Sequence, residues 1–308
     1  MIYITQGHEK SIGLEVFLKS FILLTSKNQL MFTLVTDEST LIENLKLLNL
    51  KYSIENSVLS FSGNSLQLIL TTNEELPQST TSLSKVLEVI KEGDILLTLP
   101  TSKDQLILNN EICKGYTEYL RSFYKDANLC MLFKAMEDNT LLITDHIPLK
   151  EVGSAITKEL ITKKVRTTLM YLDKYFQTID EVVISGINPH CGEGGLLGTE
   201  DKSVYEAVTE LSESISVVGP VSGDTLHFHK DTTKKQLNVY MYHDQGLPVF
   251  KNKYKTIGLN ITLGLPFIRM SVDHGTAFDL YGRGKADYSG CYYMLKEAIK
   301  LGKINGRK

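Results

Sequence analysis

Three histidines occupy equivalent positions in the sequence, each just beyond an apolar run that is typical of a buried strand. His146 follows TLLITD, His190 follows VVISGINP and His243 follows LNVYMY. Neutral imidazoles around an open coordination position are common ligands of a catalytic divalent metal. Their shared placement therefore predicts a three-histidine metal site at one edge of a sheet. For each histidine alone, a surface or capping role is the alternative.

Two aspartates lie near the same predicted strand ends. Asp244 directly follows His243, and Asp224 lies in a GDT segment. A carboxylate in such a position can orient a histidine ligand or transfer a proton. The alternative for either residue is a helix cap or a turn, which is a common role for an isolated aspartate.

A glycine-rich segment, CGEGGLLG, follows His190 at residues 191–198. A strand, two glycines and a helix are also the parts of a nucleotide-binding fingerprint, but here the third glycine is one position late and no convincing acidic residue follows the next strand. We interpret Gly192 and Gly194 as positions where the backbone approaches a metal or cofactor closely. A plain glycine-rich turn is the alternative.

Polar residues also interrupt the apolar stretch that follows. Lys251, Asn260 and Arg269 together suit an anionic substrate, because a guanidinium can bind a carboxylate or phosphate through two parallel hydrogen bonds. Arg269 ends an apolar run, so its charge needs a partner, either a structural carboxylate or a ligand. A second loop with hydrogen-bonding groups around a glycine comes next, at Asp273, His274, Gly275 and Thr276.

The elements that must position these residues alternate between strand-like and helix-like segments. Apolar runs of strand length lie at 2–5, 31–35, 66–71, 95–99, 181–187 and 237–242. Helical periodicity lies at 12–25, 41–48, 82–91, 154–175 and 201–211. Residues 129–145 vary this rhythm, since two strand-like runs flank Glu137-Asp138-Asn139 and predict an antiparallel hairpin. The alternation predicts a layered α/β architecture.

Composition indicates a globular protein. Of the 308 residues, 42% are hydrophobic and 22% charged, and the net charge of -3 gives no reason to expect binding to nucleic acid or to an anionic membrane. Four scattered cysteines without CxxC spacing favour reduced thiols. The first residues lack the build of a signal peptide, and the apolar runs are too short to span a membrane. We therefore expect a cytoplasmic protein with no membrane partner.

Five segments together resemble one known family, the 4-hydroxythreonine-4-phosphate dehydrogenases of pyridoxal phosphate biosynthesis. They read NPHCGEGGLLGTE, GPVSGDT, YHDQGLPVFK, GLNITLGLPFIRMSVDHGTA and GRGKAD. Their order and length make the resemblance specific, and it covers the chain from about His146 onward.

The resemblance implies a fold like that of the isopropylmalate and isocitrate dehydrogenases, with two α/β/α domains around a central cleft. One domain would comprise residues 1–120 and 245–308. The other would comprise residues 121–244 and carry the metal ligands and the dimer interface. The family also implies a homodimer in which each active site is completed by the partner subunit.

The resemblance further implies the chemistry. NAD or NADP would take a hydride from 4-phosphohydroxy-L-threonine, and the resulting β-keto acid would lose CO2 to give 3-amino-2-oxopropyl phosphate. A divalent metal, zinc or else Mg, Co or Mn, would be held by His146, His190 and His243. The catalytic residues would be Lys251, Asp244 and Asp224. The substrate-binding residues would be Tyr116, Thr117, Lys251, Asn260 and Arg269. The cofactor-binding residues would be Gly192, Gly194, Asp273, His274, Gly275 and Thr276.

The amino-terminal half departs from the family pattern. The GHTE substrate motif reads Gly115-Tyr116-Thr117-Glu118, with tyrosine in place of a histidine. Tyrosine still donates a hydrogen bond, but it is bulkier and does not titrate near neutral pH. This change leaves open another phosphorylated four-carbon hydroxy acid of the threonate or erythronate type as substrate. The three histidines alone would also suit a metal-dependent hydrolase, and the diverged amino-terminal half a non-catalytic relative that binds metal or phosphate.

Overall fold

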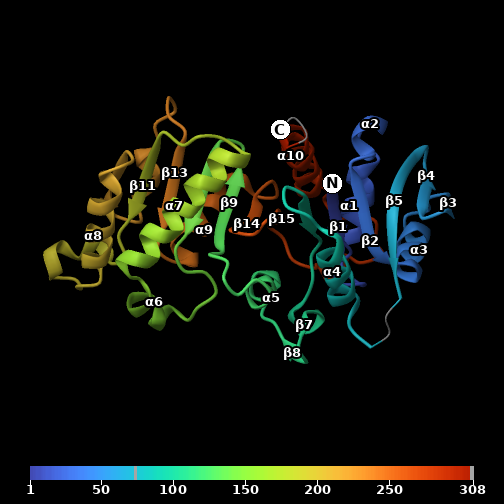
Figure 1. Ribbon diagram of the computed structural model, residues 1–308, viewed down its shortest axis with the longest axis horizontal. Helices are drawn as coiled ribbons and strands as arrows, with labels where there is room; N and C mark the ends of the chain where they lie inside the picture. Colours follow the sequence, from blue (N-terminus) through green and yellow to red (C-terminus); the bar gives the residue numbers. More distant parts are fainter. Residues whose placement is uncertain (73–74, 306–308) are drawn as a thin grey trace. The chain divides into compact units, whose positions relative to one another are not determined.

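A computed structural model describes residues 1–72 and 75–305. The chain forms two compact units (Figure 1). The first combines both ends of the chain, Met1–Ala127 and Leu265–Lys308, and the second is the continuous segment Asn128–Gly264. Strands and helices alternate along both units, which confirms the predicted α/β class. None of the helices in the described residues is both long enough and apolar enough to cross a bilayer.

The sheet of the first unit is parallel at its centre and antiparallel at one edge. Its strand order is β15 (Ile268–Val272), β6 (Ile95–Thr98), β1 (Ile2–Thr5), β2 (Phe32–Asp37), β5 (Asn64–Thr71), β4 (Val58–Phe61) and β3 (Tyr52–Glu55). The first five strands in this order run parallel, and β4 and β3 extend the sheet as a hairpin. A separate short hairpin joins β7 (Ile107–Leu108) and β8 (Glu111–Ile112).

The first unit contains six α-helices in its described residues. They are α1 (Gly13–Phe21), α2 (Ser26–Gln29), α3 (Glu38–Leu47), α4 (Gln78–Val89), α5 (Tyr116–Phe123) and α10 (Ser289–Asn305). The α1 helix packs against α10, and α4 packs against β1 and β2. Asp37 begins α3 as its cap, since its carboxylate accepts a hydrogen bond from the Thr40 backbone N–H at 2.9 Å.

The sheet of the second unit brings the predicted histidine-bearing strands together. Its order is β12 (Val217–Val221), β11 (Glu181–Ser185), β13 (Gln236–Tyr240), β10 (Asp138–Leu142), β9 (Cys130–Ala135) and β14 (Leu259–Leu263). The first four of these strands are parallel, whereas β10, β9 and β14 pair antiparallel. The predicted hairpin within residues 129–145 is therefore present as β9 and β10.

The helices of the second unit are α6 (Leu149–Ala155), α7 (Lys158–Tyr175), α8 (Asp201–Ser212) and α9 (His243–Tyr254). The predicted helix at 154–175 is interrupted, because Thr157 is extended and caps α7 by accepting from the Leu160 N–H at 3.1 Å. The α9 helix buries Leu247, Phe250 and Tyr254 in the apolar core formed with β9, β10 and β13.

The boundaries of the two units differ from those that the sequence suggested. The family resemblance implied that residues 121–127 belong to the second domain and residues 245–264 to the first. In the structure, residues 245–264 belong to the second unit because α9 packs in its core and β14 pairs with β9. A strand pair and a buried helix face are both long-range contacts, which the apolar pattern alone does not assign.

Candidate functional site

The three predicted metal ligands follow three adjacent parallel strands. His146 lies beyond β10, His243 beyond β13 and His190 beyond β11, and the order of these strands in the sheet is β11, β13, β10. Since the carboxyl ends of parallel strands meet at one edge, all three histidines belong to the same edge of the second unit. Asp224 lies at this edge too, exposed in the turn that follows β12.

Two of the histidines are neighbours. The ring centroids of His146 and His243 are 5.7 Å apart, and both rings line a cavity of about 260 Å³. His243 Nδ1 lies 2.6 Å from Asp244 Oδ1, so the carboxylate holds the ring and leaves Nε2 as the nitrogen for a ligand. This contact agrees with the predicted role of Asp244 in orienting a histidine.

His190 does not line the cavity beside His146 and His243. It lies on η2 (Pro189–Gly195), its side chain is 73% exposed, and its nearest acidic contact is Glu193 Oε1 at 3.8 Å from Nδ1. The described residues contain no group of three or more His, Cys, Asp or Glu side chains arranged to hold a metal. The closed three-histidine set that the pattern predicts is therefore not formed in this structure.

The loop that carries His190 has an unusual backbone conformation. Residues 190–194 all have positive φ, between 44° and 76°, which is unusual for His190, Cys191 and Glu193 because they carry a Cβ. The segment before the loop is fixed by Asp201, whose carboxylate accepts from the backbone N–H groups of Ile187 at 2.7 Å and Asn188 at 3.1 Å. The loop is thus tied at its base while its tip carries the strained residues.

The two glycines predicted to approach a cofactor differ in their surroundings. A Cβ at Gly192 would lie 2.8 Å from the Gly198 carbonyl oxygen, so this glycine is required by the packing of the loop on itself. No atom lies within 4 Å of the corresponding position at Gly194, where only the positive φ of 66° favours glycine. Gly192 therefore has a structural role in this loop, whatever else it contacts.

Gln245 joins two of the strand ends, a role that was not predicted from the sequence. Its Nε2 donates to the Gly186 carbonyl at 2.7 Å, and its Oε1 accepts from the Met241 N–H at 2.8 Å and the Ser185 hydroxyl at 3.0 Å. One side chain thereby connects the residues after β11 with those after β13. The sequence signal for Gln245 was its position in the HDQG segment, beside His243 and Asp244. This position does not show which distant residues its side chain contacts.

The other predicted residues of the second unit lie on α9 and β14. Lys251 is exposed on α9, two turns after His243. Asn260 pairs with Phe133 in the β14–β9 ladder, and its Oδ1 is buried with no hydrogen-bond partner among the described residues. A buried acceptor without a donor is unusual in a native structure and is consistent with a ligand position.

Arg269 and Tyr116 meet in the first unit. Arg269 on β15 is 4% exposed, and its Nε and Nη2 donate to Thr98 Oγ1 at 3.1 and 2.6 Å. Its Cζ lies 5.1 Å from the centroid of the Tyr116 ring. Burial lowers the pKa of Arg269 to about 10, which the neighbouring Tyr116 partly opposes, so the guanidinium stays charged at neutral pH. Thr117 follows on the first turn of α5 and is half-buried.

The predicted cofactor loop, residues 273–276, follows β15 in the same unit. The Thr276 carbonyl accepts from the Ile12 N–H at 3.0 Å, which ties this loop to the segment after β1. His274 Nδ1 lies 3.1 Å from the Gly275 carbonyl oxygen, and its Nε2 is buried with no hydrogen-bond partner among the described residues. Nearby, the His8 and Phe278 rings meet edge to face with centroids 4.8 Å apart.

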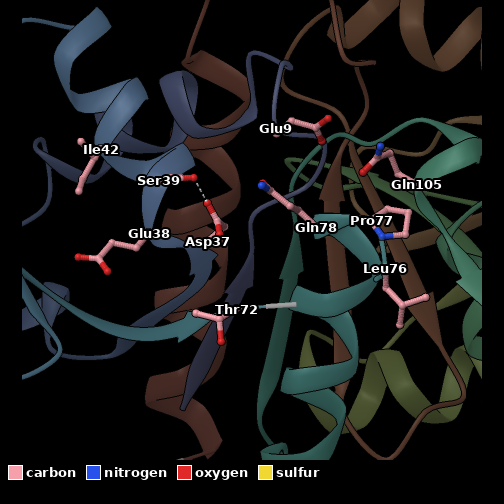
Figure 2. A pocket seen from close by; sticks show the side chains of 10 residues that line it. All are labelled: Glu9, Asp37, Glu38, Ser39, Ile42, Thr72, Leu76, Pro77, Gln78 and Gln105. Carbon is pink, nitrogen blue, oxygen red and sulfur yellow. Dashed lines mark hydrogen bonds between the residues drawn. The ribbon is translucent and has the colours of Figure 1, made fainter. Parts of the chain in front are cut away.

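A further cavity of about 930 Å³ lies in the first unit and contains none of the predicted residues (Figure 2). It is lined by Glu9, Asp37, Glu38, Ser39, Ile42, Thr72, Leu76, Pro77, Gln78 and Gln105. Figure 2 shows the residues at the start of α3 facing Leu76, Pro77 and Gln78 near the start of α4. Asp37 is engaged as the α3 cap, with Ser39 Oγ also donating to it at 2.6 Å. The carboxylates in the lining disfavour an anionic ligand.

Comparison with known proteins identifies the family. The family model described as "Pyridoxal phosphate biosynthetic protein PdxA" matches residues 35–301. The chain belongs to the PdxA family. The match includes the three histidines, Tyr116 and Arg269, so the residues described above lie within the region that the PdxA family shares.

Individual relatives agree with this assignment. A 4-hydroxythreonine-4-phosphate dehydrogenase from Marinobacter nauticus is 39% identical over 213 residues, which covers 68% of this chain and 62% of that protein. A solved structure of the Klebsiella pneumoniae enzyme of the same name superposes with a TM-score of 0.78 at 26% identity, covering 98% of this chain and 99% of that one. In the sequence matches, the chain spans under two thirds of the length of the curated relatives.

The wider fold class is confirmed as well. An isocitrate dehydrogenase from Methylococcus capsulatus superposes with a TM-score of 0.51 at 10% identity, covering 99% of this chain and 87% of that one. A likeness at this level concerns the fold alone. It agrees with the expectation of an isopropylmalate dehydrogenase-like architecture.

Proposed function

We propose that the chain is an NAD(P)-dependent decarboxylating dehydrogenase that oxidises 4-phosphohydroxy-L-threonine to 3-amino-2-oxopropyl phosphate. The observation that carries this proposal is the pairing of His146 and His243 at the edge of the β11–β13–β10 sheet, with Asp244 on His243 Nδ1. Relatives that bear the name 4-hydroxythreonine-4-phosphate dehydrogenase support it. The whole reaction would run in the cytoplasm.

The residues at this edge fit a divalent metal by their donor chemistry. His146 and His243 would hold it, and His190 from the adjacent strand end would be the third ligand. Zinc suits three imidazoles best, with Mg, Co or Mn as alternatives. When bound, such a metal polarises a substrate oxygen and stabilises the negative charge that develops during oxidation and decarboxylation.

The side chains of the chain itself would bind, orient and transfer protons. Asp244 holds the His243 ring through the 2.6 Å contact. Lys251, or else Asp224, would take the proton of the substrate hydroxyl as the carbinol hydride passes to the nicotinamide. The β-keto acid then loses CO2, and the electron pair left on carbon is protonated by the same group. Arg269, Asn260 and Thr117 would bind the substrate, with the Tyr116 ring beside Arg269. Residues 273–276, with Gly192 and Gly194, would bind the dinucleotide.

A homodimer with a shared active site is part of this proposal. Large apolar side chains are exposed in the second unit: Leu149, three residues after His146, is 71% exposed, Leu196, six residues after His190, is 79% exposed, and Phe228 on η3 is 75% exposed. Exposed apolar groups around a polar site are typical of surfaces that bind another protein. We propose that a second copy of the chain covers them. Size-exclusion chromatography with light scattering tests this, and a monomer at micromolar concentration would contradict it.

A second substrate class is favoured by one observation. Tyr116 occupies the place of a family histidine, and its ring lies against Arg269 instead of presenting a titratable nitrogen. This arrangement suits a phosphorylated four-carbon hydroxy acid that lacks the amino group, such as threonate or erythronate 4-phosphate, at least as well as the amino acid.

The decisive experiment is to follow NADH or NADPH formation with 4-phosphohydroxy-L-threonine, after chelation and after adding back each divalent metal. Metal-dependent reduction of the dinucleotide is the expected result. Threonate and erythronate 4-phosphates are the matched substrates, and turnover of these alone would assign the second class. Metal-dependent release of inorganic phosphate without dinucleotide reduction would indicate a hydrolase. Binding of metal with no turnover of any of these substrates would contradict the dehydrogenase assignment.

A further inference from the structure

Tyr116 contacts Arg269, the predicted substrate anchor. Its ring centroid lies 5.1 Å from Arg269 Cζ, and both side chains are buried, at 8% and 4% exposed. Tyr116 begins α5 and Arg269 lies in β15, so the contact joins two elements of the first unit that are far apart in sequence. A guanidinium over an aromatic ring is attracted to the face of the ring, and the attraction is stronger where water is excluded.

The hydroxyl of Tyr116 already has a partner. It donates to the Leu99 carbonyl oxygen at 3.1 Å, immediately after β6. Burial raises the pKa of Tyr116 to about 12, although Thr5, Arg269 and Thr101 oppose the shift, so the side chain remains neutral under working conditions. Tyr116 therefore cannot exchange protons near neutral pH as a histidine could. Its hydroxyl is bonded to Leu99, so we consider the contact of its ring with Arg269.

The guanidinium of Arg269 is restrained in two directions. Its Nε and Nη2 both donate to Thr98 Oγ1, which restrains rotation within the guanidinium plane. The Tyr116 ring restrains the group from another side. Thr98 is the last residue of β6 and Leu99 follows it directly, so two successive residues bond the nitrogens of Arg269 and the hydroxyl of Tyr116.

We propose that Tyr116 is a positioning residue: its ring fixes the orientation in which Arg269 binds the anionic group of the substrate. This inference rests on the proposed function, which makes Arg269 a substrate anchor. It predicts that loss of the ring weakens substrate binding, whereas loss of the hydroxyl does not. Two planar groups aligned in advance lose little freedom when the anion arrives.

The test compares Tyr116→Leu, which removes the ring, with Tyr116→Phe, which keeps it. We expect Tyr116→Leu to raise KM for the phosphorylated substrate by more than about tenfold, as loss of a desolvated cation–ring contact implies. Tyr116→Phe should raise it by less than about threefold, and kcat and KM for the dinucleotide should change as little in both variants. Equal loss in Phe and Leu would overturn the proposal and assign the hydroxyl a direct contact with substrate.

Tyr119 provides a matched control on the same helix. It is 2% exposed, and its hydroxyl lies 3.1 Å from Ser84 Oγ. Tyr119→Leu removes a buried tyrosine and should lower the melting temperature while leaving the substrate KM unchanged. A similar rise in KM in this variant would mean that Tyr116→Leu acts through general loosening of α5, and the proposal would fail.

A double-mutant cycle and a spectroscopic measurement separate this inference from the proposed function. Combined with Arg269→Lys, Tyr116→Leu should add little further loss, because both act on one group; additive losses would overturn the proposal. The Nε–H resonance of Arg269, assigned by its disappearance in Arg269→Lys, should lose its ring-current shift in Tyr116→Leu and keep it in Tyr116→Phe. This result does not need turnover. An unchanged resonance would refute the positioning role, whereas a shifted resonance in a protein without dehydrogenase activity would refute only the proposed function.

Discussion

Predicted functional residues meet at two places, the histidine edge of the second unit and the Tyr116–Arg269 pair of the first unit. The two places differ in burial and in how many hydrogen bonds the protein itself provides. At the histidine edge of the second unit, the side chains of His243 and His190 are 37% and 73% exposed, and that of Asp244 is 84% exposed. In the first unit, Arg269 and Tyr116 are buried and bonded to the end of β6. The exposed group leaves donor atoms for a ligand, whereas the buried group is aligned before any ligand arrives. Substitutions should therefore affect ligand binding in the first case, and both binding and stability in the second.

The largest expected effect is on the histidine edge. His243→Ala should reduce metal-dependent turnover by at least about 100-fold, since even outer-shell changes at metal sites lower activity by about 10–100-fold. The melting temperature should change little, because the side chain is partly exposed. Metal content by elemental analysis and steady-state kinetics measure both effects. His227→Ala, an exposed histidine on η3, is the control and should retain activity. Equal loss in the two variants would contradict the assignment.

The second-largest effect is expected at Gln245, which joins the ends of β11 and β13. Gln245→Leu removes bonds to Ser185, Gly186 and Met241, two of which involve backbone groups, and should lower the free energy of unfolding by about 2 kcal/mol. Urea denaturation measures this change. Gln177→Leu is the control, because the Nε2 of Gln177 has no hydrogen-bond partner in the described part of the chain. A loss below that of the control would show that the Gln245 bonds do not stabilise the fold.

Burial of Tyr116 beside Arg269 should make the free energy of unfolding depend on pH. The pKa of Tyr116 is raised from 10.0 to about 12 by burial, so the neutral tyrosine stabilises the fold fully below pH 10.0 and this contribution is lost as pH rises toward about 12. The loss amounts to about 1.4 kcal/mol per pH unit in this window. The lowered pKa of Arg269 acts in the opposite direction but is present in both proteins when wild type is compared with Tyr116→Phe. The difference in unfolding free energy between them should shrink above pH 10.0, and a constant difference would contradict the burial argument.

The smallest effect tests the strain in the His190 loop. Glu193 has a φ of 44°, so Glu193→Gly should relieve left-handed strain and, after the greater freedom of glycine in the unfolded chain is subtracted, stabilise the protein by about 0.5 kcal/mol. Glu193→Ala keeps the Cβ and should give no gain. Differential scanning calorimetry on both variants distinguishes them. Equal melting temperatures would indicate that the loop carries no strain at this residue.

Much of the fold could be predicted from the sequence because its signals are local. The apolar run at residues 181–187 contains strand β11, and the one at 237–242 overlaps strand β13. Two strand-like runs around residues 137–139 correspond to the β9–β10 hairpin. The histidines were placed at strand ends on the same local grounds. What the pattern could not supply was the order of strands in the sheet, which decides that His146 and His243 become neighbours.

The parts that could not be predicted depend on contacts between distant residues or on backbone strain. Nothing local in the sequence indicates that Tyr116 lies against Arg269, or that Gln245 joins β11 to β13. The sequence also favoured Gly192 and Gly194 as positions of close approach to a metal or cofactor, but it did not indicate that six successive residues, 190–195, have positive φ. Side-chain bonding and dihedral angles are set by tertiary packing, and residue type constrains them only weakly.

The assembly of the first unit from both chain ends has a consequence for synthesis on the ribosome. Residues 128–264 form a contiguous unit, which can fold as it leaves the ribosome. Strand β15 follows this unit in the chain, so it pairs with β6 only after residues 128–264 have been translated. Until then β6 lacks its hydrogen bonds to β15, and Thr98 lacks its hydrogen bonds from Arg269. Arg269 therefore reaches Thr98 and Tyr116 only after residues 128–264 have been synthesised, so the unit with the proposed substrate anchor is completed after the histidine-bearing unit.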